Sequence, residues 1–167
     1  MKNSESPASK NSSIRDLGGL VHIPKKPGTY LLLLEVSHPM TLRVGCLGNV
    51  FFNNSNHLYV GSALGKSGLR ARISRHLHNK KKIFWHIDYL LQHARVKAVY
   101  FIVSNQKLEC KIARALITRG IEFVEGFGSS DCNCESHLFV ISNVRDIEKI
   151  LRELNLKYSI VTIGEIS

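Results

Sequence analysis

The segment YVGSALGKSGLRARISRHL, residues 59–77, decides the fold. It predicts a strand that ends at Gly61, a polar glycine-containing loop, and a helix that begins near Ser67. Arg72 and His76 lie four residues apart on that helix, so their side chains share one patch of its surface. There a guanidinium can hold a phosphate and an imidazole can exchange a proton, although the same spacing is also typical of a solvated basic face. The apolar residues that turn inward at helical spacing are Leu69, Ile73 and Leu77.

Outward from this segment, apolar runs and turn residues predict the strands and helices of one compact α+β domain. Residues 37–56 predict an added β-hairpin excursion, because Gly45 and Gly48 mark a bend between two short apolar runs. The expected strands are 29–36, 41–45, 49–52, 57–61, 96–104, 138–142 and 157–163. The other expected helices are 83–94, with Ile83, Ile87, Leu90 and Leu91 turned inward, 108–120 and 144–154.

Length and composition fit a single folded domain with a basic surface. The chain has 167 residues, 44% of them hydrophobic, which is enough to bury a core. Residues 1–13 are almost all polar and predict a disordered tail, so the domain is expected to span 14–167. Lys and Arg outnumber Asp and Glu by 23 to 13, which gives a formal charge of +10 and favours a polyanionic partner.

The sequence predicts neither a membrane span nor a secretory signal. No apolar run reaches the roughly 18 residues that a bilayer span requires, and residues 2–13 lack the apolar core of a signal peptide. A cytoplasmic location without membrane contact is therefore expected. There the four cysteines would be reduced thiols or metal ligands rather than disulfides.

A second group of residues has the chemistry of a zinc site. Cys132, Cys134 and His137 lie close together in the sequence, and Cys110 could complete a tetrahedral set. The C-x-C spacing is tighter than in a usual zinc knuckle, so buried thiols beneath a loop are the alternative. The loop itself, GFGSSDC at 126–132, could instead bind an anion through its backbone N–H groups.

Basic and aromatic residues near the predicted helices suggest a nucleic-acid footprint. Three consecutive lysines precede Phe84 and Trp85, so the lysines could follow a phosphate chain while an exposed ring stacks on a base. A lysine triplet is also typical of a solvated turn. The candidates for nucleic-acid contact are Lys66, Arg70, Arg75, Lys80, Lys81, Lys82, Trp85, Ser129 and Ser130.

With GTY at 28–30 and YVG at 59–61, the chain resembles the GIY-YIG nuclease superfamily. The strings YVGSALG, RISRHL, WHIDYLL, LEC and GFGSSDCNCESHLF make it most similar to an uncharacterised, largely archaeal branch with no assigned function. The resemblance implies a small, mainly antiparallel central sheet flanked by helices, with the two motifs on neighbouring strands. Residues 37–56 are longer than the family hairpin, so the excursion could cover or extend one side of the sheet, and the sequence leaves open whether it occludes the cleft. The polar residue, often Asn, that completes some family sites has no secure counterpart.

The resemblance also implies metal-assisted hydrolysis of a phosphodiester bond. The family's catalytic positions are occupied here by Tyr30, Tyr59, Arg72, His76, His86 and Glu109. Glu109 would bind Mg²⁺ or Mn²⁺, a tyrosine would help deprotonate water, and Arg72 would neutralise charge on the phosphate. The histidines would orient the water, bind the phosphate or protonate the leaving oxygen. Taken singly, the tyrosines could be strand aromatics, Glu109 a helix-dipole partner and His86 an interface residue.

The expected function is therefore a divalent-metal-dependent endonuclease that acts on DNA, with a repair or other nucleic-acid-processing protein as a partner. The first alternative is a non-catalytic DNA- or RNA-binding accessory module that keeps the fold and the basic cleft. The second is a protein adaptor with a zinc-stabilised loop. The sequence does not determine the oligomeric state.

Overall fold

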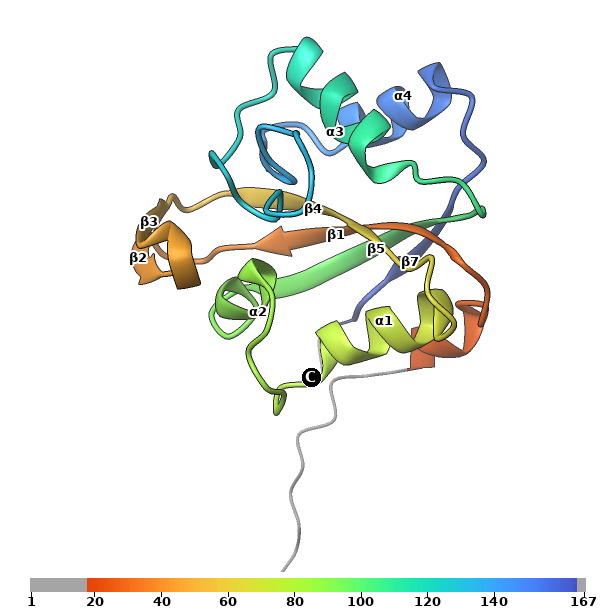
Figure 1. Cartoon of the computed structure of the whole chain (residues 1–167), viewed down its shortest axis with the longest axis horizontal. Coiled ribbons are helices and arrows are strands. Elements are labelled where there is room, and N and C mark those ends of the chain that lie inside the picture. Colours follow the sequence, from red (N-terminus) through yellow and green to blue (C-terminus); the bar gives the residue numbers. More distant parts are fainter. Residues whose placement is uncertain (1–17, 165–167) are drawn as a thin grey trace, which may run out of the picture.

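The computed structural model describes residues 18–164, which form an α+β fold with helices on both faces of one central sheet (Figure 1). The predicted tail, 1–13, lies outside the described residues. The central sheet has five strands in the order β6-β4-β1-β5-β7, and every neighbouring pair is antiparallel. A separate two-stranded sheet contains β2 and β3. The predicted fold class, a small antiparallel sheet flanked by helices with an added hairpin, is confirmed.

The central strand of the sheet is the leucine-rich run, which is buried on both faces. Side chains alternate along this strand, so Leu32 enters one hydrophobic core and Leu31 and Leu33 enter the other. In the register of the sheet, Tyr30 pairs with Gly61 on the neighbouring strand. The five strands are β1 (Gly28–Glu35), β4 (Asn56–Ser62), β5 (Arg95–Val103), β6 (Leu138–Ile141) and β7 (Ser159–Thr162).

Two pairs of helices cover the two faces of the sheet. In Figure 1, α3 and α4 lie above the sheet and α1 and α2 below it. A short 3-10 helix, η1 (Gly18–His22), contributes Leu20 to the lower core. None of the helices in the described part of the chain is both long and apolar enough to cross a membrane. The helices are α1 (Gly68–Leu77), α2 (His86–Leu90), α3 (Glu109–Thr118) and α4 (Arg145–Glu153).

The helix α1 begins at Gly68, one residue after the predicted start. Gly68 has φ +69°, and a β-carbon there would lie 2.9 Å from the Lys26 carbonyl oxygen. That closeness lets the next backbone N–H groups, of Leu69 and Arg70, donate to the carbonyls of Lys26 and Pro24. Backbone carbonyl groups just before β1 therefore cap the N-terminus of α1.

The helix α2 is much shorter than the predicted range 83–94. Asp88 accepts hydrogen bonds from the backbone N–H groups of Phe84 and Trp85, both at 2.9 Å, and Trp85 is extended with φ −101° and ψ 159°. These bonds hold residues 84–85 outside the helix. Ile83 is consequently only half-buried, whereas the other three residues predicted to turn inward, Ile87, Leu90 and Leu91, are buried.

The 37–56 excursion forms the small sheet and lies beside α2 rather than over the central strands (Figure 1). Phe52 fixes it, since this side chain is fully buried and contacts Phe127 edge-on with ring centroids 6.1 Å apart. The elements are β2 (Met40–Arg43), the 3-10 helix η2 (Gly45–Leu47) and β3 (Asn49–Phe52).

Candidate active site

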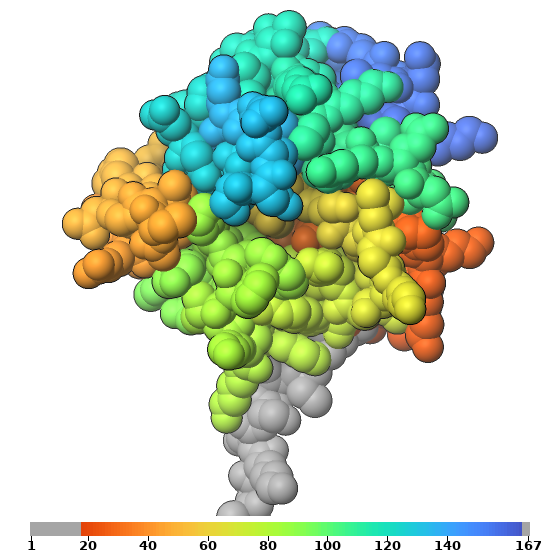
Figure 2. Space-filling view, in the orientation of Figure 1, coloured from red at the N-terminus to blue at the C-terminus, as the bar shows by residue number. Residues whose placement is uncertain are grey.

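A cleft of about 390 Å³ opens where β1 and β4 meet α1, the start of α3 and the loop before β6. Figure 2 shows the surface hollowed between that loop, in light blue, and the yellow-green elements below it. Among the described residues, none that lines the cleft comes from 37–56, so the excursion does not form part of the cleft lining. Five of the six residues expected to act together line it: Tyr30, Tyr59, Arg72, His86 and Glu109.

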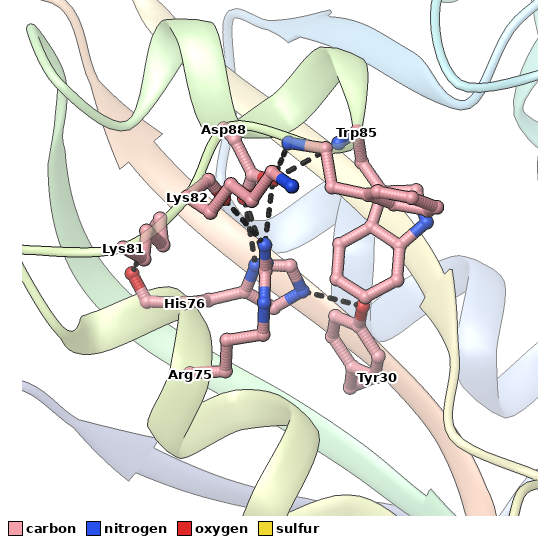
Figure 3. Close-up of polar contacts among 8 residues, drawn as sticks. Tyr30, Arg75, His76, Lys81, Lys82, Trp85 and Asp88 are labelled. Atoms are coloured by element: carbon pink, nitrogen blue, oxygen red, sulfur yellow. Dashed lines mark hydrogen bonds and ion pairs between the residues drawn. The ribbon is translucent and has the colours of Figure 1, made fainter.

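The sixth, His76, lies behind the cleft wall and contacts Tyr30. The Tyr30 hydroxyl and His76 Nε2 are 2.7 Å apart, and both side chains are almost fully buried (Figure 3). Burial raises the pKa of Tyr30 well above its usual value and lowers the pKa of His76 to about 3. At neutral pH the phenol is therefore protonated and donates its hydrogen bond to a neutral imidazole. Gly61 makes room for the ring, since a β-carbon there would lie 2.4 Å from the Tyr30 hydroxyl.

Asp88 is a buried carboxylate next to the Tyr30–His76 pair and accepts several hydrogen bonds. Its two carboxylate oxygens accept hydrogen bonds from the Arg75 guanidinium, each at 2.9 Å, besides the two backbone bonds described above. Burial alone would raise the pKa of Asp88, but the Arg75 hydrogen bonds and the backbone N–H groups hold it below its usual value. Asp88 Oδ1 also lies 3.9 Å from His76 Nδ1, a buried atom with no hydrogen-bond partner (Figure 3).

Arg72 offers a free guanidinium to the cleft. Its Cζ lies 4.5 Å from the centre of the Trp85 ring, and Arg75 Cζ lies 4.2 Å from the same centre. Within residues 18–164, Arg72 makes no ion pair with a carboxylate. The cation–π contact thus positions Arg72 without neutralising its charge.

Glu109 is the first residue of α3 and points a carboxylate into the cleft wall. It is 6% exposed, and its Oε2 is buried without a hydrogen-bond partner. Oε1 lies 3.8 Å from Lys107 Nζ. An unsatisfied buried carboxylate oxygen is costly, and a hard divalent cation is one ligand that would satisfy it. The carboxylate therefore fits the expected Mg²⁺ or Mn²⁺ site.

His86 and Tyr59 complete the cleft wall in different ways. His86 Nδ1 accepts a hydrogen bond from the Gly128 backbone N–H at 2.9 Å, which ties α2 to the loop before β6. Burial lowers the pKa of His86, so the ring is neutral and carries its proton on Nε2. Tyr59 is 8% exposed, and burial raises the pKa of its hydroxyl. Its ring centroid lies 6.4 Å from that of Tyr30.

The four residues predicted as a zinc site lie together in the structure and form a Cys₃His cluster: Cys110, Cys132, Cys134 and His137. The ligand atoms of its four side chains lie within 4.8 Å of one another, so the group could bind a metal ion. His137 Nδ1 lies 3.1 Å from the Val60 carbonyl oxygen, which leaves Nε2 facing Cys132 Sγ at 3.3 Å. Burial raises the pKa of Cys134 to about 12 and raises that of Cys110, so both thiols are protonated unless a cation stabilises the thiolates. Three members, Cys110, Cys132 and His137, also line the cleft.

The candidates for nucleic-acid contact separate into free and engaged side chains. Lys66, Lys80 and Lys82 are exposed, and Ser130 lines the cleft. Trp85 also lines the cleft, while Ser129 is half-buried. The engaged residues are Arg70, bonded to the Ile23 and Val21 carbonyls, Arg75, bonded to Asp88 and the Lys82 carbonyl, and Lys81, bonded to the His76 carbonyl.

Four backbone N–H groups of the loop 126–132 already have acceptors in the protein. Those of Gly126, Phe127, Gly128 and Cys132 donate to Glu135, Val124, His86 and Ser129. These four groups are not available to an anion, so the predicted backbone anion site is restricted to residues 129–131.

The sequence interpretation missed three residues of this site. Lys107 and Asp131 line the cleft, and Asp88 organises its lower edge. Lys107 could have been predicted as a cleft residue, because it lies only two residues before Glu109. Asp88 stood within the quoted string WHIDYLL, but nothing in helical periodicity indicates that its carboxylate turns back to Phe84 and Trp85.

Fold and site together define a small basic α+β protein with a polar cleft and an adjoining Cys₃His cluster. Residues 29–159 match the family described as "Domain of unknown function DUF123", and the chain belongs to that family. No curated protein and no solved structure matches the chain.

Proposed function

We propose that this cleft binds a DNA phosphodiester and hydrolyses it with the help of a divalent cation, as the resemblance to GIY-YIG nucleases implies. The observation that carries the proposal is the meeting of Tyr30, Arg72 and Glu109 in one cleft, from three elements far apart in the sequence. The formal charge of +10 supports a polyanionic substrate, because it raises the local concentration of nucleic acid.

Arg72 would hold the scissile phosphate. Its guanidinium can donate to two phosphate oxygens at once, and its position is restrained by the Trp85 ring. Negative charge develops on those oxygens in the transition state, where a fixed cation contributes most. Lys107 adds a second positive charge to the same cleft.

Glu109 would hold the cation. Its carboxylate lines the cleft and has an oxygen without a hydrogen-bond partner, and Mg²⁺ or Mn²⁺ bound there would supply Lewis-acid polarisation of a phosphate oxygen. A single protein carboxylate suits Mg²⁺, which keeps several of its waters and takes its other ligands from the phosphate.

Tyr30 would position the attacking water, and His76 would hold Tyr30 in place. The high pKa of Tyr30 excludes a resting phenolate, so the hydroxyl donates its proton to the hydrogen bond with His76 Nε2, 2.7 Å away, and its oxygen can accept a hydrogen bond from the water. The water oxygen then bonds to phosphorus, the bond to the leaving oxygen breaks, and the water proton passes through solvent to the leaving oxygen. Asp88, 3.9 Å from His76 Nδ1, would orient the His76 ring.

The Cys₃His cluster would bind one zinc ion with a structural role. Four N and S ligands make a closed tetrahedral set, and the Val60 carbonyl orients His137 so that Nε2 is its ligand atom. The ion would tie α3 to the loop before β6, and thereby fix Glu109, the neighbour of Cys110. The proposal predicts one zinc per purified chain, measured by atomic emission.

A non-catalytic nucleic-acid-binding module is the second candidate. The exposed lysines and the free Arg72 favour it as strongly as they favour a nuclease, since both functions need a phosphate contact. The two differ in turnover alone. Salt-sensitive binding without cleavage would support the binding module.

The test is cleavage of labelled single-stranded, duplex and branched DNA and RNA in Mg²⁺ or Mn²⁺. The matched variants are Arg72→Ala and Arg114→Ala, because Arg114 is an exposed arginine on α3 that does not line the cleft. Cleavage that falls about 10²- to 10³-fold in Arg72→Ala alone is the expected result. Equal rates in the two variants, or no cleavage of any substrate, would contradict the nuclease.

A further inference from the structure

Phe84 is an exposed aromatic side chain at the edge of the cleft. It is 73% exposed, more than any other large hydrophobic residue in the described part of the chain, and it lines the cleft together with Arg72. An isolated exposed hydrophobic residue is ordinary, but a phenyl ring beside a free guanidinium is the pairing with which proteins hold single-stranded nucleic acid.

Trp85, which the sequence also offered as a stacking ring, is already occupied. Two guanidinium carbons, of Arg72 and Arg75, lie within 4.5 Å of its ring centre. The His76 ring is 5.9 Å away, and the Phe84 ring approaches it at 5.2 Å with an interplanar angle of 85°. The ring with free area is therefore Phe84.

Phe84 is also held in place, as a stacking platform needs to be. Its backbone N–H donates to Asp88 Oδ2 at 2.9 Å, and its ring contacts the Trp85 ring edge-to-face. A ring that is already ordered loses little conformational entropy when a base stacks on it.

The charge and size of the cleft indicate what would stack there. Lys80 and Lys82 are exposed just before Phe84 in the chain, and Arg72 lies in the cleft, so a phosphate chain could pass both. The cleft volume, about 390 Å³, is at the low end of small-ligand sites, which suits one nucleotide. In a duplex both faces of each base are already stacked, so Phe84 could take only an unpaired base.

We propose that Phe84 is a stacking subsite for an unpaired nucleobase beside the phosphate held by Arg72, and that the substrate class of the cleft is single-stranded DNA, including single-stranded flaps. This inference rests on the proposed function for its phosphate contact, but it does not require turnover. Trp85 then acts as a positioning residue that supports Arg72 and Phe84.

The experiment uses a single-stranded DNA oligonucleotide that contains 2-aminopurine, a base whose fluorescence is quenched when it stacks on an aromatic ring. The full chain is titrated onto it at fixed salt without added Mg²⁺ or Mn²⁺, beside a duplex of the same sequence. The variants are Phe84→Ala, Phe84→Trp and the matched control Phe51→Ala, since Phe51 is 63% exposed on β3 and does not line the cleft.

We expect Phe84→Ala to bind the single strand about 5- to 100-fold more weakly than wild type, to lose the quenching, and to bind the duplex unchanged. Phe84→Trp should keep both signals, and Phe51→Ala should match wild type. Binding or quenching that is unchanged in Phe84→Ala would overturn the stacking subsite while leaving the nuclease proposal intact. The expected pattern without cleavage in Mn²⁺ would support the subsite and overturn the nuclease, and no binding by wild type would overturn both.

Discussion

Replacing Asp88 with asparagine is expected to lower the free energy of unfolding by about 2–4 kcal/mol. The carboxylate is fully buried and accepts four hydrogen bonds at 2.9 Å, two from Arg75 and two from the backbone of Phe84 and Trp85. Asparagine keeps one acceptor oxygen and turns an NH₂ donor toward the remaining donors. Some of these bonds are lost, and Arg75 loses its counter-charge.

The magnitude follows from the exposure of the two partners. Breaking a buried ion pair by removing one partner costs about 3–5 kcal/mol, and a hydrogen bond to a charged group contributes about 1.5–3 kcal/mol. The Arg75 side chain is 29% exposed, so water can solvate it in the variant and the lower part of the range applies. Because the pKa of Asp88 lies below its usual 3.8, this stability is fully present above about pH 4 and is lost as the pH falls through the lower folded value.

The assay is urea denaturation followed by the fluorescence of Trp85, the single tryptophan of the chain, and by circular dichroism. The matched control is Glu153→Gln, because Glu153 also pairs with an arginine, Arg119, but is 46% exposed. A surface pair of this kind contributes about 0–1 kcal/mol. If Asp88→Asn were no less stable than this control, Asp88 would not organise the lower edge of the cleft.

Three further predictions test the packing, the titration and the metal site. In Gly61→Ala the new β-carbon would lie 2.4 Å from the Tyr30 hydroxyl, so the free energy of unfolding should fall by about 1–3 kcal/mol in the same denaturation assay. The control is Gly65→Ala, whose β-carbon meets nothing within 4 Å. Equal losses of stability in the two variants would contradict the packing of Tyr30 against Gly61. The pKa of His76 is about 3 when folded against 6.5 ordinarily, so unfolding free energy should fall by up to about 1.4 kcal/mol per pH unit from pH 6.5 to 3 through this group. His76→Gln should lose that one-proton slope, and an unchanged slope would refute the assignment. Cys132→Ala should bind less zinc than wild type by atomic emission, while Cys46→Ser, an exposed cysteine outside the cluster, should not; equal zinc contents would count against the cluster.

The sequence predicts the sheet and most helices because their signals are local. The leucine-rich run is dense enough in apolar residues for a central strand, and the sequence places the start of α1 to within one residue. A helix was predicted at 83–94, but its bounds were wrong. Asp88 caps the N-terminus of α2 by accepting hydrogen bonds from the backbone N–H groups of Phe84 and Trp85, and Trp85 is extended, so the helix begins at His86. Apolar periodicity alone does not show where such a cap begins a helix.

The cleft was predicted in part, for a similar reason. The resemblance supplied the residues that line it, and the structure adds that Tyr30 and His76, 46 positions apart, share a hydrogen bond. The partners of Arg70 and Arg75 were not predictable, because a basic residue looks the same in a sequence whether it faces water or binds a buried acceptor. The Cys₃His cluster depends on α3 packing beside β4, which brings Cys110 to the loop.

The measurement that tests the central claim most directly is single-turnover cleavage of end-labelled single-stranded DNA in Mn²⁺ by wild type and Glu109→Gln. Glutamine keeps the shape of the side chain and removes the charge that would hold the cation, so the fold and DNA binding should persist. We predict that the cleavage rate falls about 10²- to 10³-fold in Glu109→Gln and is unchanged in Glu153→Gln. Cleavage by Glu109→Gln at the wild-type rate, or no cleavage by wild type, would contradict the assignment of this cleft as a metal-dependent nuclease site.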